Sequence, residues 1–268
     1  MKNMKEKGKL IGMIILILII IGGIAIATLG GKQAKTEEGK TLTIGLDDSF
    51  PPFGFRNENN EIVGLDIDIA KALCEKKGWN LEIQPISWAA KEQEIDSGNI
   101  DCIWNGFGLT PERAEKFTVT DIYIGSQNKF FTKSDSPLEK QEDFKGKKIA
   151  VQTGSIQQAD LEKSEFGKEI DELVQYNDYL TALMDLETGR IDAVFMSEIS
   201  GNYIKTTKNK EYKIIDSEGI SEPNQDVVAV KKGNTELRDE INQGLKELKE
   251  EGKLKEISEK WFGSDLTK

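Results

Sequence analysis

The stretch from Trp104 to Arg113 combines residue types that could bind a small zwitterion. Gly106 and Gly108 follow an apolar run, and Thr110-Pro111 then opens a helix whose first turn contains Arg113. Glycine lets a backbone approach a ligand closely, because no Cβ stands in the way. Backbone carbonyls can accept hydrogen bonds from an ammonium group, and a guanidinium can hold a carboxylate through two parallel bonds. The same residues suit an ordinary strand-loop-helix connection with a surface arginine, so this stretch alone leaves both interpretations open.

The composition excludes several classes of site. The 268-residue chain has no histidine, which excludes Ser-His-Asp and Cys-His catalysis and every His-ligated metal site, and we expect neither a metal nor a cofactor. The net charge is −11, and residues 32–268 alone carry 32 basic against 46 acidic side chains, because four lysines and one glutamate precede them. Since such a surface repels phosphate backbones, we expect no nucleic-acid partner.

Cys74 and Cys102 are the only cysteines. One falls in a predicted helix and the other in a strand beside it, which favours two small buried apolar residues. An exported protein could also form a disulfide, and spacing alone does not decide whether these two pair.

The amino terminus predicts export. Four lysines in residues 1–9 precede Leu10 to Leu29, a run of 20 apolar or small residues in which only Thr28 is polar. The run is long enough to span a bilayer, and the lysines place the body outside the cytoplasm. Ala25-Ile26-Ala27 resembles a signal-peptidase site, so residues 1–31 are either a cleaved signal peptide or a membrane anchor. The length of the run favours the anchor, and residues 32–40 then read as a flexible tether.

The body repeats one pattern twice, which predicts two α/β lobes. A helix end, a Gly cap and a buried strand at Ser97–Trp104 return 91 residues later at Thr188–Phe195. The strand Thr41–Leu46 likewise has an echo at Lys148–Thr153, and each is followed by a loop and a helix. Such repeats predict a parallel sheet in each lobe, with ligands bound beyond the strand ends.

Two extended segments, at 117–131 and 224–230, predict crossings between the lobes. A long amphipathic helical region at 235–261, interrupted at Gly252, would then return to the first lobe. We therefore expect lobe one at 41–126 and 228–268, lobe two at 127–227, and a cleft beside a hinge of two strands. A helix from Leu65 carries Asp66 and Asp68 in its first turn, where their charges would complement the helix dipole.

Taken together, these features resemble the extracellular solute-binding proteins of polar amino acid ABC transporters. The resemblance runs from Thr41 to Lys268 and rests on motifs whose order and spacing match: 47–53, 64–69, 106–113, 189–192 and 260–263. It implies a two-lobed, type II periplasmic-binding-protein-like fold preceded by a hydrophobic segment. It also implies a monomer at the cell surface that binds a free amino acid, hands it to an ABC permease and catalyses no reaction.

The resemblance implies a role for individual residues as well. Arg113 would grip the ligand α-carboxylate, together with the amides of Ser155 and Ile156 at a helix start. The rings of Phe50 and Trp88 would lie on opposite sides of the ligand side chain. The polar end of that side chain would be read by a further set of polar residues: Asp47, Asn105, Gln152 and Gln157.

The chain departs from the family pattern at the ammonium end. The ammonium would meet the carbonyl of Gly106 and a polar group at Gly108 or Ser197. Gly108 stands where the family often has Ser or Thr, and Ser197 where it usually has an Asp. Glu198 would point the other way in a strand. Either a neighbour such as Asp226 supplies the negative charge, or the ligand is unusual.

Two other functions stay open, as does the ligand. An enzyme on the same fold, similar to cyclohexadienyl (prephenate/arogenate) dehydratases, would need a carboxylic acid aimed into the cleft, and Asp47 or Glu198 are candidates without an activating pair. A ligand-sensing module would be expected to carry a partner domain or a further transmembrane helix. Asp47 with Trp88 and Phe50 suits a polar or cationic side chain, which leaves glutamine, arginine, lysine, histidine and cystine.

Overall fold

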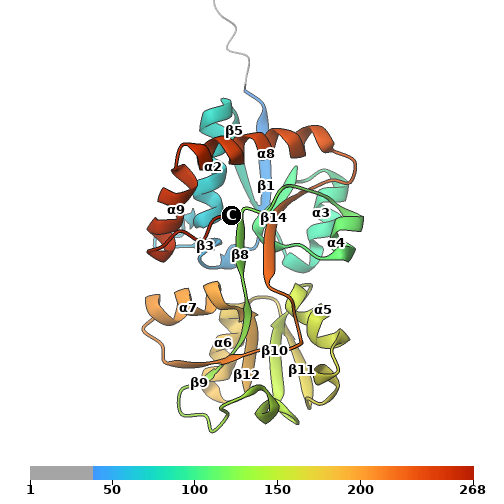
Figure 1. The fold of residues 1–268 in the computed structure, drawn as a ribbon, viewed down its shortest axis with the longest axis vertical. Coiled ribbons are helices and arrows are strands. Elements are labelled where there is room, and N and C mark those ends of the chain that lie inside the picture. The colour runs from blue at the N-terminus through green and yellow to red at the C-terminus, as the bar shows by residue number, and fades with distance from the viewer. Residues whose placement is uncertain (1–38) are drawn as a thin grey trace, which may run out of the picture. The chain divides into compact units, whose positions relative to one another are not determined.

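The computed structural model describes residues 39–268, so the predicted signal or anchor segment and residues 32–38 of the tether lie outside the described residues. No helix of residues 39–268 is long and apolar enough to cross a membrane. The described chain forms two lobes (Figure 1). Its elements in order are β1 Thr41–Leu46, β2 Ser49–Phe50, β3 Gly54–Arg56, β4 Ile62–Val63, α2 Leu65–Lys77, β5 Asn80–Pro85, η1 Trp88–Ala90, α3 Lys91–Ser97, β6 Cys102–Gly108, α4 Pro111–Lys116, β7 Thr118–Val119, β8 Ile124–Ser126, β9 Asn128–Lys133, η2 Gln141–Phe144, β10 Lys148–Gln152, α5 Ile156–Lys163, η3 Phe166–Lys168, β11 Glu172–Tyr176, α6 Tyr179–Thr188, β12 Ala193–Ser197, α7 Glu198–Thr207, β13 Tyr212–Asp216, β14 Asn224–Val230, α8 Thr235–Glu250 and α9 Lys253–Phe262.

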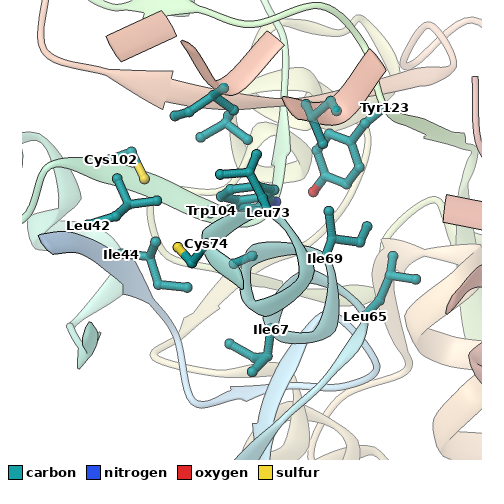
Figure 2. Packing of buried hydrophobic residues seen from close by; sticks show 14 of the residues in the cluster. Leu42, Ile44, Leu65, Ile67, Ile69, Leu73, Cys74, Cys102, Trp104 and Tyr123 are labelled. Atoms are coloured by element: carbon teal, nitrogen blue, oxygen red, sulfur yellow. The ribbon is translucent and has the colours of Figure 1, made fainter. Parts of the chain in front are cut away.

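The first lobe is built on a mixed sheet with strand order β5-β1-β6-β14-β7, and β8 also pairs with β14. β1 runs parallel to β5 and β6, whereas β14 is antiparallel to β6, β7 and β8. Helices α2, α8 and α9 cover one side of this sheet (Figure 1). Figure 2 shows the core there, where apolar side chains of α2 meet those of β1 and β6.

The second lobe has the strand order β11-β10-β12-β9-β13, in which β10 is parallel to β11 and β12. β9 is antiparallel to both of its neighbours. The prediction of parallel sheets is therefore right only for three strands of each lobe: β1, β5 and β6 in the first, and β10, β11 and β12 in the second. β14 and β9 follow crossings between the lobes, so they enter their sheets from the end where the other strands finish and must run the opposite way.

The predicted hinge of two strands is present. β8 and β14 run side by side between the lobes, and Ser126 pairs with Asn224 and Ile124 with Asp226 (Figure 1). The predicted return of the chain to the first lobe is also confirmed, because α8 and α9 pack on α2 and are separated at Gly252, whose φ is +75°. The residue boundaries of the lobes given above stay a prediction.

Local signals behave as the sequence predicts at the helix ends. Gly98 and Gly189, the two caps of the repeated pattern, both adopt left-handed conformations with φ of +79° and +76°. Thr110 caps α4, because its hydroxyl accepts a bond from the Arg113 amide at 3.2 Å. Both cysteines are buried and free in the first-lobe core (Figure 2).

Strand β6 is longer than predicted. The sequence suggests that the strand ends at Trp104 before a glycine loop, but β6 continues to Gly108. It can do so because β14 runs beside it, pairing Val227 with Phe107 and Asp226 with Gly108 across an irregular register. The glycines therefore lie at the end of a paired strand, where Gly108 is next to Ile156 of the other lobe, and their backbone stays in a defined position.

Candidate ligand-binding cleft

A small cleft lies between the two lobes, beside the hinge. Eleven of the twelve residues predicted for the site line it, and the exception is Asp47. The enclosed space is about 20 Å³, which is close to the volume that one water molecule needs. The lining comes from both lobes and consists of Phe50, Phe53, Trp88, Asn105, Gly106, Gly108, Arg113, Gln152, Ser155, Ile156, Gln157, Tyr179, Ser197, Asn224 and Asp226.

Arg113 is a buried cation at one end of the cleft. Cap formation at Thr110 and the short helix α4 direct its side chain back toward β6, where Nη1 donates to the Gly108 carbonyl at 2.7 Å. Nη2 donates to the Gly154 carbonyl of the other lobe at 3.2 Å. Burial lowers the pKa of Arg113 to about 10, so the group is protonated at neutral pH. No carboxylate of residues 39–268 forms an ion pair with it.

Asp226 is a buried acid on the other side of Gly108. It lies on the hinge strand β14, and its Oδ1 is 3.7 Å from the position that a Cβ on Gly108 would occupy. Asp226 is only 3% exposed. Within residues 39–268, its carboxylate accepts no hydrogen bond. Burial raises the pKa of Asp226 to about 7, while the Arg113 charge acts in the opposite direction. The cleft thus presents one positive and one negative group without an ion-pair partner.

Asp47 lies next to the cleft but outside its lining. Its Oδ2 accepts a bond from Gln152 Nε2 across the lobes at 2.6 Å, and its Oδ1 accepts one from the Ser49 amide at 2.9 Å. The Asp47 amide in turn donates to Asn105 Oδ1 at 3.1 Å. Burial raises the pKa of Asp47 to about 6, so it is mostly ionised at neutral pH. This acid contacts the second lobe through Gln152.

Aromatic rings form one wall of the cleft. Phe50 stacks on Phe53 with centroids 5.2 Å apart and lies 5.9 Å from the ring of Tyr179, which belongs to the second lobe. Phe50 also packs against the hydrophobic cores of both lobes. Trp88, the ring predicted on the opposite side, is buried and packs edge-on against Phe107. Phe53 lines the cleft from the predicted motif at 47–53, whereas Tyr179 is a lining residue that sequence reasoning missed.

A network of amides closes the hinge side of the cleft. Asn128 Oδ1 accepts bonds from Gln157 Nε2 at 2.7 Å and from Asn224 Nδ2 at 2.9 Å. Tyr179 donates its hydroxyl to Gln157 Oε1 at 3.1 Å. Gln157 was predicted to read the ligand, whereas Asn224 was not; the only signal for Asn224 was its place at the start of a predicted crossing strand.

Gly106 is held in place by Asp66. The amide of Gly106, whose φ is +54°, donates to Asp66 Oδ2 at 2.7 Å. The hydroxyl of Tyr123, just before hinge strand β8, donates to Asp66 Oδ1 at 2.8 Å. Burial raises the pKa of Asp66 to about 8, while its hydrogen bonds with Tyr123 and Gly106 act in the opposite direction. Asp66 lies in the first turn of α2, as predicted, and its carboxylate also fixes a strand of the cleft to the residue before the hinge.

Ser197 and Glu198, the two candidate residues at the end of β12, face different parts of the molecule. Ser197 lines the cleft, and its hydroxyl lies 3.3 Å from that of Ser126 on the hinge. Glu198 begins α7 and lines a different groove, which lies between α7, the hinge and α9, so it does not aim into the cleft as an acid catalyst would. No group of three or more Cys, Asp or Glu side chains that could hold a metal ion occurs in residues 39–268.

Residues 42–264 match the family described as bacterial extracellular solute-binding proteins, family 3. The chain belongs to this family. This solute-binding protein is 27% identical to the L-cystine-binding protein TcyJ of Escherichia coli K12, with 95% of each chain covered. It is 28% identical to the arginine-binding extracellular protein ArtP of Bacillus subtilis, over 89% of this chain and 92% of that protein.

A solved structure agrees in fold. The substrate-binding protein of an ABC uptake transporter from Streptococcus pneumoniae, with bound histidine, is 35% identical and superposes with a TM-score of 0.82. The match covers 85% of this chain and 94% of that one. The two-lobed α/β fold of solute-binding proteins is thus established for this chain, and the family to which it belongs is extracytoplasmic.

Proposed function

We propose that this solute-binding protein captures a free polar amino acid between its lobes and delivers it to an ABC permease for uptake. The observation that carries the proposal is the pair of buried charges on either side of Gly108. Arg113 and Asp226 each lack an ion-pair partner within residues 39–268, and unpaired buried charges are costly. A zwitterionic amino acid supplies a carboxylate for the first and an ammonium for the second.

The remaining lining groups fit the rest of an amino acid. The amides of Ser155 and Ile156 at the start of α5 would support the carboxylate, and the Gly106 carbonyl the ammonium. Phe50 and Trp88 would hold the side chain, whose polar end would meet amide groups. The predicted contribution of Asp47 becomes indirect, because its carboxylate is already bonded to Gln152. Glutamine, arginine, lysine, histidine and cystine all meet these requirements.

Binding requires the lobes to separate and close, because about 20 Å³ does not hold an amino acid. Hinge closure of this kind is a known behaviour of periplasmic binding proteins. The described conformation has several contacts that join one lobe to the other and that opening would break. They connect Asp47 with Gln152, Arg113 and Lys91 with Gly154, Glu112 with Lys163, and Pro51 with Ser200.

A thermal-shift screen of the full chain against the free amino acids and cystine tests the proposal. A ligand at 100 times its dissociation constant stabilises the folded state by about 2.7 kcal/mol, which raises the melting temperature measurably. Titration calorimetry on each hit then gives the dissociation constant. A chain that responds to none of these compounds would contradict the proposal.

We also propose that the protein is a monomer without enzymatic activity, anchored or released at the cell surface. The relatives described above are binding proteins, and among residues 39–268 the cleft holds no acid paired with an activating base. Incubation with prephenate and with arogenate tests the dehydratase alternative directly, since turnover of either compound would establish an enzyme. The genes beside this one test the sensor alternative, since a permease and an ATPase there would favour transport.

A further inference from the structure

Lys91 is a buried cation beside the cleft for which the proposed function gives no role. It is the first residue of α3 and is only 4% exposed. Its Nζ donates to the carbonyl oxygens of Trp88 at 3.2 Å and of Gly154 at 2.9 Å, and no carboxylate of residues 39–268 forms an ion pair with it. Burial, and next the Arg113 charge, lower the pKa of Lys91 to about 8. A buried ammonium with only carbonyl partners is an unbalanced charge.

Two cations of the first lobe converge on one oxygen atom of the second. The Gly154 carbonyl accepts hydrogen bonds from Lys91 Nζ at 2.9 Å and from Arg113 Nη2 at 3.2 Å, so these nitrogens are at most about 6.1 Å apart. A groove between α3, α4 and the start of α5 adjoins the cleft and is called its mouth. Lys91 lines this mouth, and Arg113 lines both the mouth and the cleft. One carbonyl oxygen carries a partial charge only. A carboxylate at this point would offer one full negative charge and two oxygens, one for each cation.

The surroundings of Gly154 also suit an anion. Gly154 precedes Ser155, the cap of α5, so the start of that helix, where the helix dipole is positive, lies beside the two cations. A Cβ on Gly154 would lie 3.1 Å from Lys91 Nζ and 3.4 Å from Ala89 Cα, so this loop is in close contact with the first lobe. When the lobes open, the Gly154 carbonyl moves away, and Lys91 and Arg113 then face the space between the lobes.

We propose that Lys91 is a second cation of the carboxylate subsite, and that its ammonium and the Arg113 guanidinium together hold the carboxylate of the amino acid. The inference rests on the proposed function. It makes closure depend on the ligand: without an anion, closing buries two like charges against one carbonyl, whereas a bound carboxylate balances them. A ligand shifts the open-closed equilibrium only by such a difference between the two states.

The test compares three single variants of the full chain by titration calorimetry. Lys91→Met removes the charge, Lys91→Arg keeps it, and Lys116→Met removes an equal charge from the same mouth. Lys116 is the matched control because its ammonium is already paired with both oxygens of Glu92, at 2.9 and 3.0 Å. The probes are arginine, lysine, histidine, glutamine and cystine, and then the α-carboxamide of the tightest binder, measured by displacement where its binding is weak.

We expect Lys91→Met to weaken binding of the amino acid at least tenfold, Lys91→Arg at most threefold and Lys116→Met at most twofold. Affinity for the carboxamide should change little, so the preference for acid over amide falls about tenfold. The melting temperature of ligand-free Lys91→Met should not fall, because the substitution removes an unbalanced charge.

Unchanged affinity in Lys91→Met, or equal losses for acid and amide, would overturn the inference. So would a fall in the ligand-free melting temperature that accompanies the loss of affinity, since Lys91 would then act through the fold. If the wild-type protein binds none of the probes or other free amino acids, the proposed function fails and the inference fails with it. If the wild-type protein binds and Lys91→Met binds equally well, only the inference fails.

Discussion

Replacing Asp226 with asparagine should remove most of the affinity for an ammonium-bearing ligand and leave the fold intact. The side chain is buried, has no hydrogen bond within residues 39–268 and changes little in shape on substitution. Neutralising one partner of a buried, hydrogen-bonded charge pair costs about 2–5 kcal/mol. This corresponds to a rise of about 30-fold to 5,000-fold in the dissociation constant. Asparagine would also remove the burial penalty of the ligand-free acid.

The pKa of Asp226 adds a pH dependence with a defined sign. Ligand ammonium requires the ionised carboxylate, so affinity should rise with pH up to about 7 and then level off. With a pKa of about 7, one titrating group lowers the affinity on the order of 15-fold between pH 7 and pH 5.5. The ligand-free protein should behave in the opposite way. Because the folded pKa is raised above 3.8, the stabilisation is present below pH 4 and is lost as pH rises through 7.

Calorimetric titration of wild type and Asp226→Asn at pH 5.5, 7 and 8, with the tightest amino acid, measures both effects. Ser197→Ala is the informative control, because Ser197 is the position where the family resemblance places an acid. We expect it to lose less than 1 kcal/mol, about the value of an ordinary hydrogen bond. The reasoning would be refuted if Asp226→Asn bound within threefold of wild type and its affinity had the same pH dependence. A large loss of affinity in Ser197→Ala would indicate that Ser197, rather than Asp226, contacts the ammonium.

Three further substitutions test other parts of the cleft. Arg113→Ala should abolish binding detectable by calorimetry while thermal unfolding stays cooperative, and near-normal affinity would exclude its role at the carboxylate. Phe50→Ala should weaken binding by about 2 kcal/mol if its ring is buried against the ligand, and a calorimetric loss below 0.5 kcal/mol would place the ring outside the contact. Tyr123→Phe removes one of two hydrogen bonds to the buried Asp66, so the free energy of unfolding measured with denaturant should fall by about 1–3 kcal/mol. An unchanged free energy of unfolding would show that this bond makes no net contribution to stability.

Much of the fold could be predicted because its signals are local. Glycine caps, a Thr-Pro helix start and the repeated strand pattern each specify a short piece of backbone, and their order predicts two lobes. The length of β6 could not be predicted in this way. Its last residues are a strand only because β14, more than a hundred residues later, lies beside them. Glycines at the end of an apolar run look the same in a loop and on a paired strand.

For the site, too, local signals could be predicted and contacts between distant segments could not. The predicted residues within recognisable motifs line one cleft, with the exception of Asp47. Tyr179 and Asn224 were missed because they reach the cleft only through the closed arrangement of the lobes, which no local pattern reports. The first-turn position of Asp66 was predicted, but its contacts were not. A carboxylate in the first turn of a helix suits the dipole whether it faces solvent or the interior, and only the contacts with Gly106 and Tyr123 show that it faces inward.

The position of the buried charges determines which end of the ligand can drive closure. Arg113 follows β6 and Asp226 lies on β14, so both proposed charge contacts belong to the first sheet. An amino acid held by these two groups alone gains nothing when the lobes close, since the contacts are equal in the open and closed forms. At Ser197, where an acid would tie the ammonium to the second lobe, this chain has a neutral hydroxyl. Of the two charged ends of the ligand, only the carboxylate end would therefore favour closure, because the α5 amides would meet the ligand there and the two cations would lose their mutual repulsion.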